Sequence, residues 1–276
     1  MFSSQFYHPQ FTIHNSQLNM FDYTPPPSLL ANRVILVTGA GDGIGSAAAK
    51  SFATHGATVI LLGRTTSKLE AVYDEIEQAG HPQPAIYPMD LEGASPNDYE
   101  NLAKILETEF GQLNGLLHNA GQLGTLTPLE HYDINQWYKI LQVNLNAPFL
   151  LTKACLRLMK RAFDASIVFT SSNVGYKGKA YWGAYAVSKF AIVGMMQILA
   201  DELEANTDIR VNSINPGAVR TKMRAAAYPG EDSQLLDLPE TIMPSYLYLM
   251  GPDSHEINGQ TLFVNGKQAT ANGENR

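Results

Sequence analysis

The sequence predicts an α/β protein with a doubly wound parallel sheet of about seven strands and helices on both faces. Short apolar runs rich in β-branched residues alternate with longer amphipathic stretches from residue 33 onward. Such alternation is typical of βαβ units, in which each parallel strand is joined to the next through a helix. A glycine-rich turn also follows the first apolar run directly, at residues 39–45. We therefore expect one sheet whose ligand-binding edge lies at the carboxyl ends of its strands.

The first expected strand is a β-branched apolar run of the kind found in a sheet covered on both faces. The expected strands fall at residues 33–38, 58–62, 85–87, 115–118, 166–170, 210–214 and 261–264. The expected helices fall at residues 43–55, 67–79, 97–110, 134–161, 182–205 and 240–250. The helix at 67 begins with Ser67 and Glu70, a spacing typical of a capping box.

The first 28 residues differ in composition from the rest of the chain. Residues 1–28 contain no Lys or Arg and a single acid, Asp22, and they end in three prolines at 25–27. They have neither the basic and apolar regions of a signal peptide nor the arginines of a transit peptide. We expect a flexible leader, or a non-native one if Met20 is the true start. Residues 29–276 are expected to form one domain.

Composition excludes several classes of function. The net charge of −7 and the pI near 5.5 argue against a nucleic-acid-binding surface. One cysteine, Cys155, excludes an internal disulfide and a cysteine-based metal cluster. It lies in an apolar helical run and is expected to be a buried thiol. We expect no metal site, no apolar stretch long enough to span a membrane and a cytoplasmic location.

The turn at residues 39–45 predicts a phosphate-binding site. Its glycines are Gly39, Gly41, Gly43 and Gly45. They do not fit the usual fingerprint Gly-x-Gly-x-x-Gly, because position 44 is Ile. Glycines between a strand and a helix let a pyrophosphate approach the helix N-terminus closely. The alternative is a turn with a purely structural role, and the position between strand and helix favours the phosphate site.

The end of the second strand indicates which dinucleotide is bound. Arg64 lies 19 residues after Gly45, where an acid would bind the ribose 2′-hydroxyl of NAD. A guanidinium instead matches a 2′-phosphate with two hydrogen bonds. Residues 65–68 could add three hydroxyl groups and the charge of Lys68. Asp42 argues the other way because it places a negative charge nearby. We predict NADP(H) in preference to NAD(H).

Tyr185 and Lys189 form a candidate proton-transfer pair. Their spacing of four puts both side chains on one face of a helix. A nearby ammonium favours the phenolate and lowers the pKa of a tyrosine from its ordinary value near 10. The pattern alone is weak, because Tyr-x-x-x-Lys occurs by chance in many helices.

The remaining candidate residues fall together at one edge of the predicted sheet. The carboxyl ends of its strands are followed by Gly39, Gly63-Arg64, Asp90, Asn119-Ala120-Gly121, Ser171-Ser172 and Pro216-Gly217. This coincidence weighs more than any single motif.

Taken in order, these motifs resemble the short-chain dehydrogenase/reductase family over about residues 31–266. The matching residues are Thr38-Gly39-x-x-x-Gly43-Ile44-Gly45, Asn119-Ala120-Gly121, Ser172, Tyr185-x-x-x-Lys189 and Pro216-Gly217-x-x-x-Thr221. Details such as Leu61-Leu62-Gly63-Arg64 and Trp182-Gly183-Ala184-Tyr185 resemble the bacterial YciK-type oxidoreductases. The resemblance implies a Rossmann-type fold.

The resemblance also implies roles for four catalytic residues. Tyr185 would donate a proton to the substrate's carbonyl oxygen, and Ser172, 13 residues earlier, would hydrogen-bond the same oxygen. Ser171 is the less favoured alternative. Lys189 would lower the pKa of Tyr185 and hold the ribose of the nicotinamide. Asn144 would hold a water in a proton relay, or would be a buried polar residue whose partners satisfy it.

The resemblance assigns the cofactor to residues along the whole sheet edge. Asp90 and Leu91 would contact the adenine, Asn119 the edge beside the ribose, and Thr221 the nicotinamide amide. The full expected set is Gly39, Gly41, Asp42, Gly43, Ile44, Gly45, Arg64, Asp90, Leu91, Asn119, Ala120, Gly121, Tyr185, Lys189, Pro216, Gly217, Val219 and Thr221.

Three positions depart from the family pattern. Asp42 occupies a place that is often basic in members that bind NADP. Gly266-Lys267 stands where the family has two glycines, which puts the far edge of the sheet in doubt. Residues 222–238 are short for a substrate lid, so that a lid at about 218–238 would leave the pocket open or closed by a partner.

The sequence thus predicts an NADP(H)-dependent oxidoreductase that interconverts a carbonyl and an alcohol by hydride transfer, with Tyr185 as general acid/base. The alternatives are a protein on the same fold that senses NADP(H) without catalysis, or an interaction protein. The intact catalytic set favours an enzyme. We expect a small-molecule substrate and a homodimer or homotetramer formed through the helices at 134–161 and 182–205.

The substrate itself cannot be predicted from the sequence. Arg220, Lys222 and Arg224 could attract an acidic substrate, although a solvated loop is the favoured interpretation. The pocket candidates are Gln122, Leu123, Val174, Tyr181, Trp182, Ala218 and Met223.

Overall fold

The computed structural model describes residues 23–264 and contains one parallel sheet of seven strands. The strand order is β3-β2-β1-β4-β5-β6-β7, and every neighbouring pair is parallel. The predicted fold class is therefore confirmed. Most of the predicted leader and Gly266-Lys267 lie outside the described residues. The strands are β1 (Val34–Thr38), β2 (Thr58–Gly63), β3 (Ala85–Pro88), β4 (Gly115–His118), β5 (Ala165–Thr170), β6 (Ile209–Asn215) and β7 (Thr261–Phe263).

The central strands are buried along their whole length. Every residue of β1, β4, β5 and β6 is buried, which explains why β1, β4 and β5 are mostly apolar rather than alternating. β6 instead buries several polar residues, among them Arg210 and Asn212. The order of the strands reverses between β1 and β4, which are adjacent although two strands separate them in the chain. A crevice forms at such a switch point, beyond the carboxyl ends of the strands.

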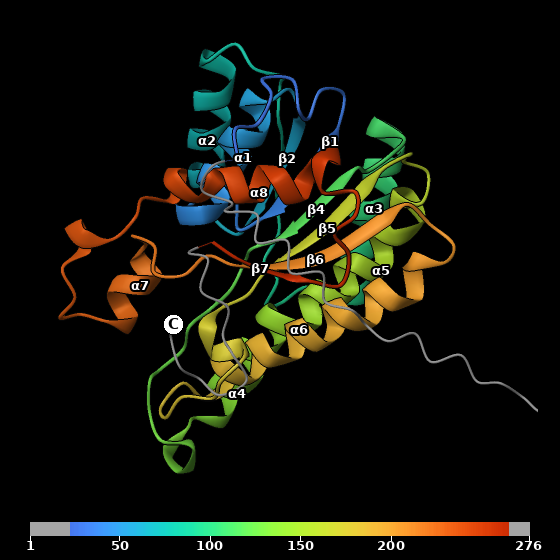
Figure 1. The fold of residues 1–276 in the computed structure, drawn as a ribbon. Coiled ribbons are helices and arrows are strands. Elements are labelled where there is room, and N and C mark those ends of the chain that lie inside the picture. Colours follow the sequence, from blue (N-terminus) through green and yellow to red (C-terminus); the bar gives the residue numbers. More distant parts are fainter. Residues whose placement is uncertain (1–22, 265–276) are drawn as a thin grey trace, which may run out of the picture.

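Helices cover both faces of the sheet (Figure 1). One face carries α1, α2 and α8, whose apolar residues share a hydrophobic cluster with β1 and β2. The other face carries α3, α5 and α6, which share a second cluster with β4 and β5. Their bounds are α1 (Gly43–Thr54), α2 (Thr66–Gln78), α3 (Pro96–Phe110), α5 (Ala147–Met159), α6 (Gly183–Glu204) and α8 (Met243–Met250).

The amphipathic stretch predicted as one segment, 134–161, is divided into three. α4 (Ile134–Leu141) leads into a single π-helical turn, Gln142–Asn146, and α5 follows. Such turns interrupt helices mostly at functional sites. This one carries Asn144, which is buried.

α6 lies within its predicted range, 182–205, but is more apolar than the sequence analysis allowed for. By length and composition alone it passes the test for a membrane-crossing helix, so the expectation that no stretch approaches that length is wrong. Its buried residues, among them Ile192 and Met196, pack in the second hydrophobic cluster against the sheet. A core helix passes the same test.

The predicted lid, residues 218–238, projects from the body of the protein beside the carboxyl edge of the sheet (Figure 1). It contains α7 (Lys222–Ala227). Its two ends are tied by a bridge between Val219 and Asp237 and by the hydrogen bond from the Arg220 amide to the Asp237 carbonyl, 2.8 Å. The first and last residues of the lid are thus held next to each other.

Candidate active site

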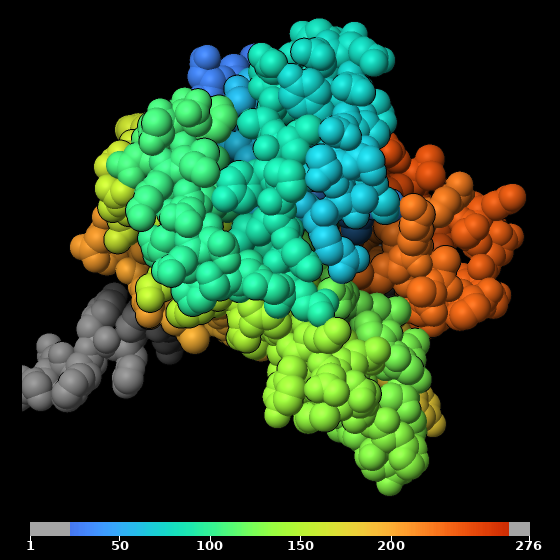
Figure 2. Space-filling view, turned by 180° about the vertical axis from the view of Figure 1, so that it is seen from behind, coloured from blue at the N-terminus to red at the C-terminus, as the bar shows by residue number. Residues whose placement is uncertain are grey.

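A cleft of about 460 Å³ runs along the carboxyl edge of the sheet. In the space-filling view, the cyan residues around the start of α2 and the orange lid stand on either side of a hollow (Figure 2). All predicted cofactor residues except Gly45 line the cleft, and so does Ser172. Of the predicted catalytic residues, only Asn144 does not line it.

The glycine turn has the backbone that its sequence suggested. Gly39 has φ +68° and Gly43 has φ +53°, conformations that favour glycine because it has no Cβ. A Cβ at Gly45 would lie 2.1 Å from the Gly39 carbonyl oxygen. Gly45 therefore permits the close packing of α1 on the turn. Gly39 and Gly41 permit the close approach of Ala120 and Lys68, since a Cβ on them would lie 3.0 Å and 2.9 Å from these residues.

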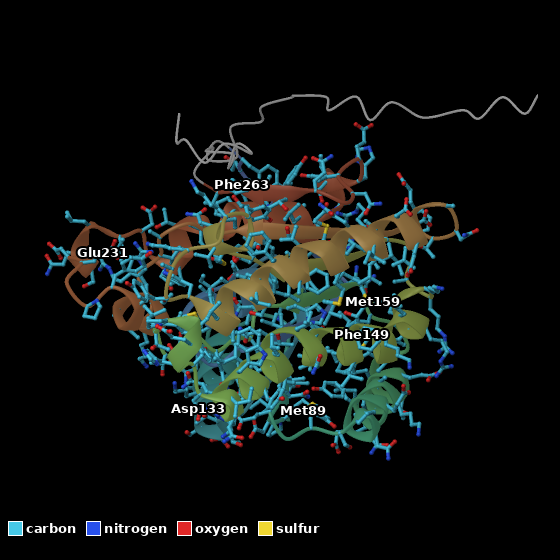
Figure 3. The ribbon with its side chains drawn as sticks, turned by 90° about the horizontal axis from the view of Figure 1, so that it is seen from below. Met89, Asp133, Phe149, Met159, Glu231 and Phe263 are labelled. Atoms are coloured by element: carbon cyan, nitrogen blue, oxygen red, sulfur yellow. The ribbon has the colours of Figure 1, made fainter. Side chains whose placement is uncertain are left out.

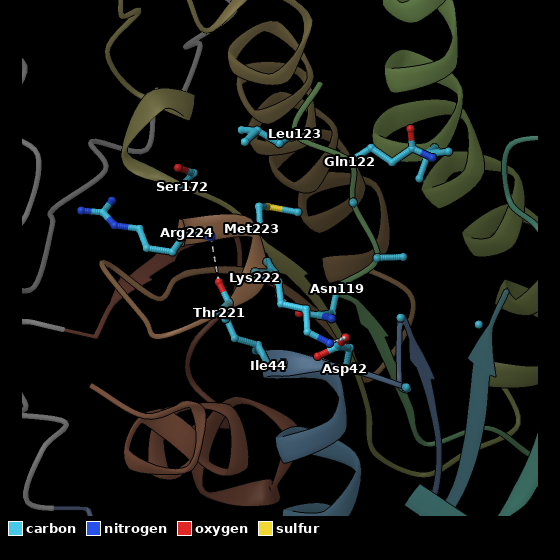
Figure 4. Close-up of a pocket in the computed structure, with 18 of the residues that line it drawn as sticks. Asp42, Ile44, Asn119, Gln122, Leu123, Ser172, Thr221, Lys222, Met223 and Arg224 are labelled. Atoms are coloured by element: carbon cyan, nitrogen blue, oxygen red, sulfur yellow. Dashed lines mark hydrogen bonds and ion pairs between the residues drawn. The ribbon is translucent and has the colours of Figure 1, made fainter. Parts of the chain in front are cut away.

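Charged side chains at this end of the cleft pair with one another. The Oδ2 atom of Asp42 accepts hydrogen bonds from the ammonium groups of Lys68, at 2.7 Å, and Lys222, at 2.9 Å. These contacts, led by the one from Lys68, lower the pKa of Asp42. Lys222 reaches Asp42 from the lid (Figure 4). Arg64 is exposed, lines the same part of the cleft and lowers the pKa of the nearby Glu92 carboxyl, after the larger effects of Lys139 and Gln122.

Tyr185 lies at the other end of the cleft and is almost entirely buried. Burial raises the pKa of its hydroxyl to about 12, and the Ser172 hydroxyl offsets part of this shift. The phenol is therefore protonated at neutral pH. Ser172 is the second residue after β5, which brings it close to the start of α6.

Lys189 does not lower the pKa of Tyr185 in this structure, although the spacing suggested that it would. Its ammonium donates a hydrogen bond of 2.7 Å to the carbonyl oxygen of Thr170 and lies 5.6 Å from the centre of the Tyr185 ring. Burial lowers the pKa of Lys189 to about 8. In this structure desolvation governs both groups, so the pKa of Tyr185 is raised where the sequence analysis expected it to be lowered.

Asn144 connects the π-helical turn to the loop after β4. Its Oδ1 accepts from the Gln122 amide at 2.8 Å, and its Nδ2 donates to the Gln122 carbonyl at 2.9 Å and to the Ser188 hydroxyl at 3.1 Å. Asn144 is thus a buried polar residue satisfied by protein partners, as one of the two interpretations expected. It holds the segment of Gly121 and Gln122 beside Lys189, whose Nζ would be 3.9 Å from a Cβ on Gly121.

Thr38 was not among the predicted site residues, although it fixes the loop that contains three of them. Its hydroxyl donates to the Leu117 carbonyl at 3.2 Å and accepts from the amides of Asn119 and Ala120, each at 3.0 Å. Asn119 also donates to the Thr38 carbonyl. Two signals were available: Thr38 ends an apolar strand, and it stands first in the motif that resembles the family.

The part of the cleft beyond Tyr185 is apolar. Trp182 and Tyr185 are buried in a small cluster with Val174 and Ala186, and the lid residues Met223 and Tyr228 pack against it. Of the predicted pocket residues, Gln122, Leu123, Trp182 and Met223 line the cleft, Val174 lies in the cluster behind it, and Tyr181 and Ala218 are not among its lining residues. Tyr228 and Ala227 were missed, because nothing in the lid's sequence shows which residues face inward.

The three lid cations are all engaged. Arg224 forms two hydrogen bonds with the Glu231 carboxylate, each 2.6 Å, and Lys222 pairs with Asp42. Arg220 donates to the carbonyls of Gln234 and Leu236. The favoured interpretation of these charges as part of a loop rather than a substrate-binding group therefore holds.

The sequence of the chain matches a known protein family. The family model described as short chain dehydrogenase matches residues 33–232. The uncharacterized oxidoreductase YciK of Escherichia coli strain K12 is 49% identical over 239 residues, which cover 87% of this chain and 94% of that protein. The chain belongs to the short-chain dehydrogenase/reductase family. The predicted resemblance, including that to YciK, is confirmed.

Solved structures of other short-chain dehydrogenases agree with this assignment. A putative short chain dehydrogenase from Pseudomonas syringae has a TM-score of 0.87 at 58% identity and covers 89% of this chain and 99% of its own. A putative short chain dehydrogenase from Escherichia coli CFT073, complexed with NADPH, has a TM-score of 0.84 at 49% identity and covers 87% and 99%. The protein is therefore an oxidoreductase of the short-chain dehydrogenase/reductase family.

Proposed function

We propose that this protein is an NADP(H)-dependent oxidoreductase that interconverts a carbonyl and an alcohol by hydride transfer, with Tyr185 as the general acid/base. The observation that carries the proposal is the position of the Tyr185 phenol, which lines the cleft beside the Ser172 hydroxyl and has the Lys189 ammonium 5.6 Å from its ring centre. A group protonated at neutral pH is ready to donate a proton to a carbonyl oxygen. We place this activity in one catalytic domain, residues 29–276, with residues 218–238 as its short lid.

The residues of the cleft fit a nicotinamide dinucleotide. Gly41 and Gly43 leave the turn bare at the start of α1, where backbone N–H groups favour a phosphate. The hydroxyl of Ser171 lines the cleft, is buried and has no hydrogen-bond partner among the described residues, so a ligand there would satisfy it. When bound, the cofactor supplies the hydride.

The chain's own residues would move and stabilise the proton. In reduction, Tyr185 donates its proton to the developing alkoxide and Ser172 donates a hydrogen bond to the same oxygen. Lys189, with a pKa of about 8, is mostly cationic at neutral pH and stabilises the phenolate that remains. Asn144 keeps the loop at Gln122 in place beside them.

A preference for NADP(H) over NAD(H) is part of the proposal. Arg64 and Lys68 supply positive charge where the 2′-phosphate would lie, and no acid follows β2 directly. The NADPH complex of the E. coli CFT073 relative supports this choice. Binding titrations with NADPH and NADH test it, and tighter binding of NADH would contradict it.

We further propose a cytoplasmic homodimer or homotetramer that pairs through the helices at 134–161 and 182–205. This face exposes large apolar side chains, including Phe149 of α5 (Figure 3). The others on these helices are Ile134, Tyr138, Val187, Phe190 and Ile198. Light scattering coupled to size exclusion measures the state, and a monomer at micromolar concentration would contradict the proposal.

A panel of ketones, aldehydes and alcohols, assayed with NADPH and NADP⁺, tests the proposed reaction. The proposal predicts NADPH oxidation with at least one class of carbonyl compound. A protein that only senses NADPH would bind the cofactor and turn over no member of the panel.

A further inference from the structure

Lys179 contacts two residues that line the substrate side of the cleft, Trp182 and Tyr228, and it differs from the cations of the lid. Lys179 lies in the loop between Ser172 and Tyr185 and is exposed. It forms no ion pair in the part of the chain that the structure describes. The lid cations Arg224 and Lys222, in contrast, are paired with Glu231 and Asp42. No carboxylate of the described residues therefore competes with a ligand for Lys179.

Two aromatic rings hold the Lys179 ammonium in place. Its Nζ lies 5.1 Å from the centre of the Tyr228 ring and 5.6 Å from that of Trp182, and it donates a hydrogen bond of 3.0 Å to the Tyr228 hydroxyl. Cations are attracted to aromatic faces at such distances. An ammonium has three N–H donors, and the phenol takes one of them. The other two have no protein acceptor among the described residues.

Trp182 connects this ammonium to the proton donor. The Trp182 ring lies 5.8 Å from the ring of Tyr185 and also 5.8 Å from that of Tyr228. The Lys179 ammonium and the Tyr185 phenol therefore flank the same indole. A ligand in the cleft that spans the accessible edge of Trp182 would lie between them.

The surface between the two groups is apolar. Leu123, Met223 and Ala227 line it together with Trp182 and Tyr228. Pockets of this kind bind the body of a ligand through apolar contacts and fix its orientation through a few polar groups. Here the polar groups are the phenol at one end and the ammonium at the other.

We propose that the substrate is an anionic carbonyl compound, or the matching hydroxy acid, in which an apolar body about the size of one aromatic ring separates the carbonyl from a carboxylate. Lys179 binds the carboxylate, Trp182 and Tyr228 contact the body, and Tyr185 faces the carbonyl oxygen. This inference rests on the proposed function, since it names the substrate class of the same site. Lys179 is then the residue that selects acids over neutral compounds.

The test uses 4-acetylbenzoate and its methyl ester, which share a body and a ketone and differ in one charge. Reduction is followed by NADPH oxidation, and equilibrium binding to the NADP⁺-loaded protein is followed by calorimetry. The acid should bind at least about tenfold more tightly than the ester, because a hydrogen bond between two charged groups is stronger than its neutral counterpart. The apparent KM for the acid should be lower by a similar factor.

Substitutions at Lys179 separate charge recognition from a role in holding the lid. Lys179→Met should abolish the preference for the acid and leave ester binding within about twofold, while Lys179→Arg should retain it. Tyr228→Phe removes the hydroxyl that ties Lys179 to the lid and should leave the preference in place. Lys177→Met, in the same loop, removes an equal charge that contacts neither ring in the described structure and is the matched control.

The outcomes distinguish failure of this inference from failure of the proposed reaction. Equal binding of acid and ester, absence of binding by both, or an unchanged preference in Lys179→Met would overturn the anionic substrate class. An equal loss in Lys177→Met would do the same, because it would reduce the effect to overall charge. Selective binding of the acid without NADPH oxidation would support the anion site and count against the proposed reaction with this ketone.

Discussion

The two ends of the cleft use charge in opposite ways. At the phosphate end, Lys68, Lys222 and Asp42 are exposed and paired, with side-chain exposures of 46%, 82% and 44%. At the reaction end, Lys189 and Tyr185 are only 6% and 7% exposed and have no charged partner among the described residues. The exposed side chains at the phosphate end can exchange one ionic partner for another. Burial at the reaction end instead shifts the pKa of Tyr185 and of Lys189.

This difference separates what each end contributes. Exposed ion pairs contribute roughly 0–1 kcal/mol and weaken with salt, so the phosphate end mainly sets which dinucleotide binds. The change in the Lys189 pKa from 10.5 to about 8 corresponds to about 3 kcal/mol against the charged form. Substitutions at the reaction end should therefore change both catalysis and stability, and those at the phosphate end should change affinity alone.

Removing the phenol should have the largest effect. Tyr185→Phe keeps the ring and its packing on Trp182, and it deletes the proton donor. We expect kcat to fall by about 10³-fold, within the range of general acid catalysis, and the NADPH dissociation constant to stay within about threefold. Steady-state kinetics and a binding titration measure the two quantities. Turnover comparable to that of the wild type would remove Tyr185 from the mechanism.

Removing the buried ammonium should impair turnover and stabilise the fold. Lys189→Met should lower kcat by about 10²-fold through loss of electrostatic stabilisation. It should raise the unfolding free energy at pH 7 by about 2 kcal/mol, because the relief of desolvation exceeds the lost hydrogen bond to Thr170. Thermal unfolding should show a Tm higher by roughly 5 °C.

The pH dependence of that gain has a defined sign. The folded pKa of Lys189 is depressed from 10.5 to about 8, so above pH 8 the folded wild type releases a proton that the unfolded chain keeps. Wild-type stability from this group therefore rises with pH between about 8 and 10.5. The advantage of Lys189→Met should be full at pH 7 and shrink through that window. An advantage that stays constant up to pH 10 would show that desolvation of Lys189 is not its cause.

Removing the charge after β2 should change cofactor choice. Arg64→Met should weaken NADPH binding by about tenfold, the value expected for loss of one charge-assisted contact, and leave NADH within about twofold. The loss should diminish at high salt. Fluorescence titrations at two salt concentrations measure it, and an equal loss for both cofactors would argue against contact with the 2′-phosphate.

The smallest effect is expected at Asp42 and has a counter-intuitive sign. Asp42 occupies the ammonium groups of Lys68 and Lys222, so it competes with a bound phosphate. Asp42→Asn should therefore tighten NADPH by about two- to fivefold, in keeping with exposed ion pairs. Glu70 lies on α2, as Lys68 does, and forms no ion pair with either lysine among the described residues. Glu70→Gln therefore removes an equal charge and should leave the affinity for NADPH unchanged. Weaker binding of NADPH by Asp42→Asn would show that Asp42 positions the lysines instead.

The sheet and its edge could be predicted because their signals are local. β1 and β5 are mostly apolar and are buried over their full length, and Gly39 and Gly43 have a positive φ that favours glycine. The spacing of Tyr185 and Lys189 gave the helix face correctly. Parallel strands ending at one edge then brought the predicted residues together.

The rest depended on contacts between distant segments. The partner of Lys189 is a backbone carbonyl of β5, which no side-chain pattern reveals, so its effect on Tyr185 was misjudged. The π-helical turn at Asn144 interrupts a stretch whose amphipathic period looked continuous. Tyr228 meets Trp182 and Lys179 only because the lid folds back on the cleft.

Deuterium transfer from [4,4-²H₂]NADPH tests the central claim most directly. The labelled cofactor is incubated with a panel of carbonyl compounds and either wild-type protein or Tyr185→Phe, and the products are analysed by mass spectrometry. The account predicts an alcohol with one deuterium on its carbinol carbon from the wild type, and essentially none from Tyr185→Phe. Wild-type protein that binds NADPH yet yields no deuterated alcohol from any carbonyl class would contradict it.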